Sequence, residues 1–215
     1  PTTVFAVALL LFVALIFSPL GLGGGVLYVP IFHYLLDWGI QESIIGSLLL
    51  VFMVALGSSL SHKKLGYTDS TIANAGRISA IPFAIIGTIL AGFLLDNVGE
   101  VGIKILAAVI LIFIIERTIT RMRKEPSENK TPPNFEPLKK KYQAGAALAG
   151  AVSGILGGGI GAIIVTLNRS LLKMDPHKAA GISYQIYSTT VPVALLSHII
   201  LSGVTRDLIN SIGIV

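Results

Sequence analysis

The sequence predicts an all-α protein: a polytopic transmembrane helical bundle of two internal repeats, each opening with a glycine-broken helix that is either discontinuous or re-entrant. Three observations predict this class. Of the 215 residues, 53% are hydrophobic and 13% are charged, with a mean hydropathy of +0.81, whereas soluble domains carry about 25% charged residues. Apolar stretches recur along the whole chain, and two of them contain three adjacent glycines. A cleaved leader does not explain stretches that recur in this way.

The first apolar stretch, residues 4–36, contains Ser18-Pro19 and the run Gly23-Gly24-Gly25. As one helix it would be about 50 Å long, well beyond a hydrocarbon core of roughly 30 Å. It must therefore break or fold back. A break at membrane depth leaves backbone N–H and C=O groups that only protein or a cavity can satisfy, so it marks a pathway or a binding site.

Further spans and one polar tract follow in order. The first half continues with three apolar segments, residues 44–61, 72–95 and 101–115 with its flanks. The polar tract at 116–142 contains four prolines and is typical of a solvated linker. The second half has a glycine-broken segment at 144–172, a span at 179–201 and an apolar segment that begins near residue 208. We expect a first repeat at 1–121, a linker at 122–142 and a second repeat at 143–215.

The two halves align with each other beyond the glycine runs. Gly23-Gly24-Gly25 matches Gly157-Gly158-Gly159, and Ser61-His62 matches Ser197-His198 in almost the same register. In this alignment the second half lacks an equivalent of residues 80–121, or two spans.

Loop charges indicate an orientation. Most of the net charge of +5 lies at residues 117–141, beside a span, which is typical of cytoplasmic loops and not of a nucleic-acid site. The links at 37–42 and 96–100 are acidic. We therefore expect a multi-pass protein of the cell membrane with its central linker in the cytoplasm. Re-entrant glycine segments would make the halves inverted repeats and crossing segments would make them parallel repeats; both arrangements stay open.

The residues resemble a known family. The motif Gly-Leu-Gly-Gly-Gly-Val-Leu-Tyr-Val-Pro at 21–30, its copy at 154–165, and the small-residue motifs at 44–48 and 179–183 are similar to those of the TauE/SafE sulfite exporter family. The second copy departs from the family pattern, with Thr166 near the point where a proline is usual. The resemblance implies transport of small sulfur oxyanions or sulfonates.

Glycine runs suit a small anion because their backbone N–H groups are uncharged donors that no side chain covers, and a helix N-terminus adds a partial positive charge. We predict that Gly23, Gly24 and Gly25, with their copies Gly157, Gly158 and Gly159, hold the anion. The alternative is close helix packing through small residues. Ser47 and Ser183 follow the two breaks and could donate to the anion, or only to their own helices.

Three cationic or titratable residues are candidates beside the glycines. Arg169 follows the second break and could draw an anion into a vestibule, or act as a positive-inside residue. His198 has apolar neighbours and could carry a proton, although its match to His62 favours a structural capping role. Arg77 lies near the end of a span, where we expect its side chain to extend to the interface.

The sequence carries no signature of an enzyme. It has no cysteine, no phosphate-binding loop, no His-Glu-x-x-His motif and no spaced carboxylate pair. We predict a transporter without cofactor or metal, with a small anion and the lipid bilayer as partners and export as its direction; homo-oligomerisation stays open. The alternatives are a channel or permease for an unrelated solute, and a membrane-embedded enzyme or partner subunit.

Overall fold

The computed structural model describes residues 2–123, 133–158 and 160–201, and every regular element in those ranges is helical. The elements are α1 (Thr2–Phe17), α2 (Gly25–Leu35), α3 (Ile40–Lys64), α4 (Ser70–Val98), α5 (Glu100–Arg123), the short 3-10 helix η1 (Glu136–Leu138), α6 (Lys139–Leu156), α7 (Ile160–Ser170) and α8 (Pro176–Leu201). The predicted all-α class is confirmed. The predicted last apolar segment, residues 124–132 of the linker and Gly159 lie outside the described residues.

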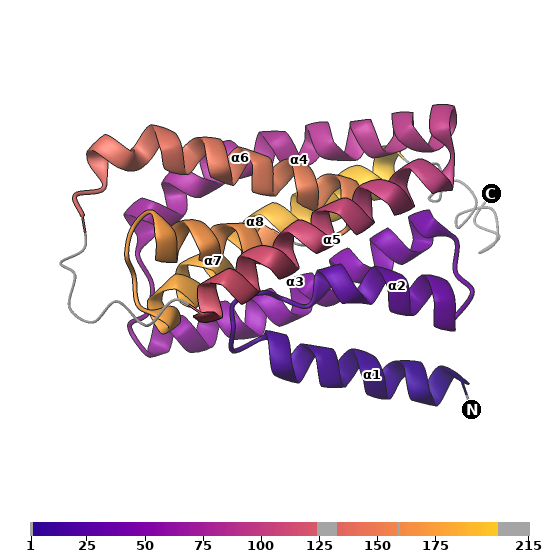
Figure 1. Ribbon diagram of the computed structural model, residues 1–215, viewed down its shortest axis with the longest axis horizontal. Coiled ribbons are helices and arrows are strands. Elements are labelled where there is room, and N and C mark those ends of the chain that lie inside the picture. The colour runs from indigo at the N-terminus through magenta and orange to yellow at the C-terminus, as the bar shows by residue number, and fades with distance from the viewer. Residues whose placement is uncertain (1, 124–132, 159, 202–215) are drawn as a thin grey trace.

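The chain reverses twice without crossing the bundle. In Figure 1, α1 enters from the right of the view and α2 returns to the right, while α6 enters from the left and α7 returns to the left. Each reversal lies at a glycine run: helix is absent between Phe17 and Gly25, and α6 ends at Leu156 with Gly157 in the left-handed region at φ 72°. Consequently α3 and α8, which follow the two reversals, run in opposite directions. Inverted halves require these directions, although the repeat itself stays a prediction.

Local signals explain where the long helices begin and end. Asp69 caps α4, because its carboxylate accepts from the N–H groups of Thr71 and Ile72 at 3.1 and 3.2 Å. Asp175 caps α8 in the same way, accepting from the N–H groups of the second and third residues of the helix, both at 3.0 Å. Gly99, at φ 74°, ends α4. These caps fix the links at the two ends of the bundle.

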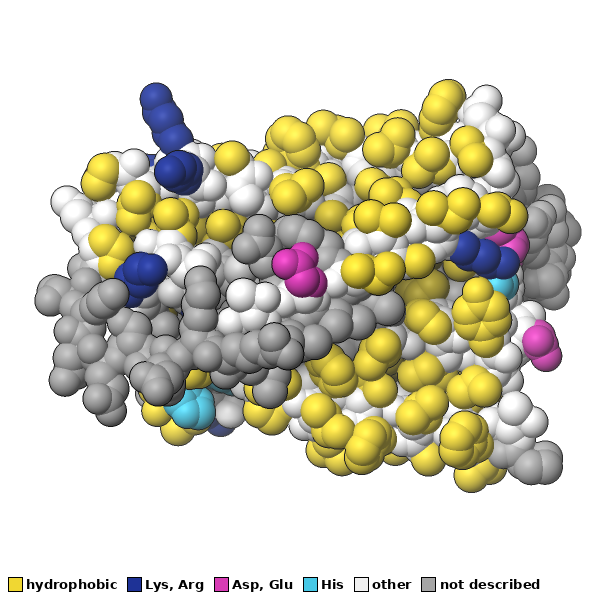
Figure 2. All heavy atoms as spheres, in the orientation of Figure 1, with side chains coloured by type: hydrophobic (Ala, Val, Ile, Leu, Met, Phe, Trp, Pro, Cys, Tyr) yellow, Lys and Arg dark blue, Asp and Glu magenta, His cyan; other side chains and the backbone are white. Residues whose placement is uncertain are grey.

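Two described helices, α3 and α4, are long and apolar enough to cross a membrane. Figure 2 shows apolar side chains spread over one broad face of the molecule, with Lys and Arg side chains clustered at its left. Exposed side chains such as Leu11, Met53 and Ile89 are 62, 62 and 56% accessible. An apolar exterior of this extent suits lipid contact and would be costly in water.

The interior is closed by small residues where α4 packs along α6. A Cβ on Gly150 would lie 2.8 Å from the carbonyl carbon of Ala80, and one on Gly154 would lie 2.7 Å from the backbone nitrogen of Thr88. Close approach of this kind replaces the hydrophobic effect as the main source of helix association in lipid. The α4–α6 contact therefore joins the two predicted halves through their backbones.

The basic and the acidic link residues lie at opposite ends of the helical bundle. Basic residues in the last turn of α3, the first turn of α6 and the last turn of α7 lie at the left end in Figure 1, namely His62, Lys63, Lys64, Lys139, Lys140, Lys141 and Arg169. The acidic link residues at 37, 42, 96 and 100 lie at the right end. Because the second glycine segment returns to the left, the basic links of both halves share one end.

Candidate functional site

The two glycine breaks meet inside the bundle. A Cβ on Gly158 would lie 2.7 Å from the Cα of Gly25, and one on Gly25 would lie 2.9 Å from the Cα of Gly158. No side chain larger than glycine fits at either position without moving backbone. We call this contact between Gly25 and Gly158 the glycine crossing. Segments far apart in the sequence, one from each half, thus touch through their backbones.

Ser47 joins the two breaks. Its Oγ lies 3.0 Å from the carbonyl oxygen of Gly25 and 2.8 Å from that of Gly157, and the side chain is fully buried. One hydroxyl proton is therefore shared between the two carbonyl oxygens. The prediction that Ser47 lies at the breaks agrees with this position, but in this structure it donates to backbone and not toward an open space.

Hydroxyl groups of α8 donate hydrogen bonds to three further carbonyl oxygens of the first break. Ser183 donates to Gly21 O at 3.2 Å, Tyr184 donates to Ser18 O at 2.6 Å, and Tyr187 donates to Leu22 O at 3.2 Å. Among the described residues, the N–H groups of Gly24 and Gly25 have no hydrogen-bond partner.

The second break differs. The Gly157 N–H donates to Ser153 O at 3.0 Å, and the Gly161 N–H donates to the Tyr187 hydroxyl. Gly157 also packs against Ile44, since a Cβ there would lie 2.8 Å from Ile44 O. Two donors of the second break, the N–H groups of Gly157 and Gly161, are thus used within the protein.

The two remaining predicted residues lie apart from the crossing. His198 is buried in the last turns of α8, where its Nε2 lies 2.6 Å from Gly154 O, one turn before the second break. Arg169 lies in the last turn of α7, at the end of that helix remote from its glycine. Arg77 does not stand free at the interface: its Nε and Nη2 donate to Gln185 O of α8 at 3.0 and 2.6 Å.

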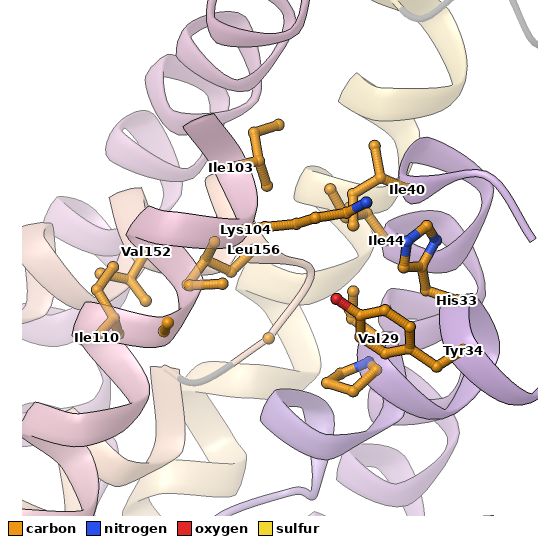
Figure 3. A pocket seen from close by; sticks show the side chains of 14 residues that line it. Val29, His33, Tyr34, Ile40, Ile44, Ile103, Lys104, Ile110, Val152 and Leu156 are labelled. Atoms are coloured by element: carbon orange, nitrogen blue, oxygen red, sulfur yellow. The ribbon is translucent and has the colours of Figure 1, made fainter. Parts of the chain in front are cut away.

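A pocket of about 210 Å³ lies beside the crossing (Figure 3). It lies between α2, α3, α5 and α6 and reaches Gly158. Its walls are apolar, with Ile44, Ile103 and Leu156 among them, whereas Lys104 and His33 supply its nitrogen atoms. The Lys104 ammonium is 3.0 Å from a carboxylate oxygen of Glu100. The pocket therefore has an apolar wall, and the Lys104 ammonium on it is already paired with a carboxylate.

Comparison with known proteins identifies the lineage. A family model described as sulfite exporter TauE/SafE matches residues 6–215. The chain belongs to the TauE/SafE family. A probable membrane transporter protein of Methanocaldococcus jannaschii is similar to this TauE/SafE chain, at 28% identity over 94% of the chain and 74% of that relative. No solved structure matches it. The protein is thus a membrane transporter by family, and the predicted resemblance is confirmed.

Three tyrosines at the first break of this TauE/SafE protein were missed by sequence reasoning. Tyr28, Tyr184 and Tyr187 are at most 1% exposed. A signal was present, since Tyr28 lies inside the glycine motif and the other two closely follow Ser183. Tyrosine in an apolar stretch is common at membrane interfaces, so composition did not distinguish these three.

Proposed function

We propose that the protein carries a small sulfur-containing anion, such as sulfite or a sulfonate, outward across the cell membrane. The observation that carries this proposal is the glycine crossing, where broken helices from opposite ends of the bundle meet. Broken helices that meet in this way place helix N-termini inside the protein, where their N–H groups and dipoles favour a negative charge without a buried cation. Membership of a family described by sulfite export supports the choice of anion.

The two predicted repeats, 1–121 and 143–215, supply one break each, and the linker at 122–142 lies in the cytoplasm in this proposal. The shared basic end of both halves supports that orientation, since cytoplasmic loops carry an excess of Lys and Arg. An inside-negative membrane potential then drives an anion outward by about 2.3 kcal/mol per charge per 100 mV. Export follows from this driving force without a coupled ion.

Alternating access follows from the contact at the crossing. In this proposal the pocket opens toward the acidic end, and the Gly25–Gly158 contact with Ser47 closes the path beyond it. Release of the anion would then use the pocket, and capture from the cytoplasm would require the two breaks to separate. A transporter that moves one set of helices against another around a fixed site works in this way.

Sulfite flux in proteoliposomes tests the proposal. Purified protein is reconstituted with sulfite inside, and efflux is followed as the internal concentration and an imposed potential are varied. We expect a rate that saturates with sulfite and rises when the sulfite-loaded side is made negative. Matched vesicles with the Gly158→Leu variant should lose the flux, because the leucine side chain would occupy the crossing. Flux of sulfite at the rate of empty vesicles would refute the function, and a current that never saturates would favour a channel.

A further inference from the structure

The Tyr28 hydroxyl is a buried donor without a partner. Tyr28 lies in the second turn of α2 and is 1% exposed, and its hydroxyl is one of three buried side-chain atoms in the described ranges that make no hydrogen bond. Native proteins pair almost all such groups, because an unpaired buried hydroxyl is destabilising. An exception of this kind leaves a donor that a bound molecule could pair.

This hydroxyl is aimed at the start of its own helix. A Cβ on Gly24 would lie 2.7 Å from the Tyr28 hydroxyl oxygen and 3.1 Å from the side chain of Val13 on α1. Gly24 is the N-cap of α2, at φ 78° and with no side-chain cap. The hydroxyl therefore lies over the turn that carries the two unpartnered N–H groups, those of Gly24 and Gly25, and Val13 walls that turn on the side of α1.

The electrostatics of this turn favour an anion. The N-terminus of a helix carries about half a positive charge, and the first turn of α2 has no acidic residue to neutralise it. Gly23 and Gly24 both have positive φ, at 72° and 78°, so the backbone of the break is shaped by two glycines in succession. Three carbonyl oxygens of the break, those of Ser18, Gly21 and Leu22, accept from the hydroxyls of Tyr184, Ser183 and Tyr187 and are turned away from free contact with an anion.

The neighbouring tyrosines show why Tyr28 differs from them. Tyr184 and Tyr187 use their hydroxyl protons on the carbonyl oxygens of Ser18 and Leu22. Tyr187 also accepts from the N–H of Gly161. Both side chains therefore hold the break in shape, and the proton of Tyr28 stays available.

We infer that the Tyr28 hydroxyl and the N–H groups of Gly24 and Gly25 form a single oxyanion-binding site at the first glycine break. The second break serves as its packing wall through Gly158. This inference rests on the proposed function and makes it specific: one neutral hydroxyl at the first break selects for an acceptor-rich anion. A compact oxyanion such as sulfite satisfies all three donors at once.

Sulfite-dependent thermal stability of the full chain, purified in detergent, tests the inference. The probe is sulfite, with chloride at equal ionic strength as the reference salt. In Tyr28→Phe we expect the melting temperature without sulfite to equal or exceed that of the unaltered protein, because an unpaired buried hydroxyl is removed. We expect the sulfite concentration for half-maximal stabilisation to rise about tenfold or more, the usual effect of losing a hydrogen bond to a charged group.

Tyr67→Phe is the matched control, since it removes the same atom from a half-buried tyrosine in the link before α4. It should leave the half-maximal concentration unchanged. A Tyr28→Phe protein that melts lower without sulfite would show that the hydroxyl has a structural partner, and would overturn the inference. An unchanged sulfite response in that variant would overturn it as well, while the proposed function would stand. If the unaltered protein gives no response to sulfite, the sulfite assignment and this inference fail together.

Discussion

Removing the Ser47 hydroxyl should separate the two halves of the glycine crossing. Ser47 is fully buried and its Oγ lies within 3.0 Å of the carbonyl oxygens of Gly25 and Gly157. Ser47→Ala leaves both acceptors without this donor, in a place that water does not reach. A buried polar group left unpaired costs about 1–3 kcal/mol. We therefore expect the free energy of unfolding to fall by about 2 kcal/mol, which lowers the melting temperature by roughly 4–8 °C for a chain of this size.

Ser43→Ala provides the matched control on the same helix. Ser43 is as deeply buried, but its Oγ donates to Gly39 O of its own turn, and that oxygen also accepts from the Ser43 N–H at 3.0 Å. Removing the Ser43 hydroxyl leaves no acceptor unpaired, so we expect the free energy of unfolding to change by less than about 1 kcal/mol. The assay is the temperature at which purified protein in detergent loses its monodisperse peak. Equal melting temperatures for the two variants would refute the bridging role of Ser47.

Two further predictions concern packing and orientation. Gly158→Ala places a Cβ 2.7 Å from the Cα of Gly25, so the backbone must move. We expect this variant to lose about 1–3 kcal/mol of unfolding free energy. The control is Gly57→Ala, whose Cβ would meet no atom within 4 Å; it should be neutral or stabilising by up to about 1 kcal/mol. Equal melting temperatures for Gly158→Ala and Gly57→Ala would contradict the close backbone contact at the glycine crossing. Because the chain has no cysteine, Lys63→Cys and Asp96→Cys can be labelled singly. We expect an impermeant maleimide to reach residue 96 in intact cells and residue 63 only after permeabilisation; the reverse pattern would invert the proposed orientation.

Much of the architecture followed from local pattern. Helical class came from apolar stretches too long for strands, and the reversals lie at the glycine runs that composition singled out. The acidic and basic links separate to opposite ends as their loop charges indicated. These features depend on residues close together in the chain, so the sequence alone could carry them.

The side-chain roles at the breaks were less predictable. Ser47 and Ser183 were predicted to donate to an anion or to their own helices; in the structure each donates to a carbonyl oxygen of the first break, and Ser47 also to Gly157 O. Arg77 was predicted to extend to the interface, and the bond from its guanidinium to Gln185 O was not predicted. Each partner lies on another helix, and residue spacing within one helix contains no information about it.

The sequence by itself determined that this chain is helical and apolar, that its first apolar stretch must break or fold back, and which links are basic. These features are local, because in lipid every span must satisfy its own backbone hydrogen bonds, and a glycine run weakens the helix that makes those bonds. Only the tertiary structure decided that the backbone reverses at both glycine runs, that the two breaks touch at Gly25 and Gly158, and which hydroxyls hold the first break. The physical reason is that a hydroxyl has one proton, and the packing of α8 against the first break determines which oxygen receives it. Tyr28 is left with its proton free because no helix in the described part of the chain brings it an acceptor.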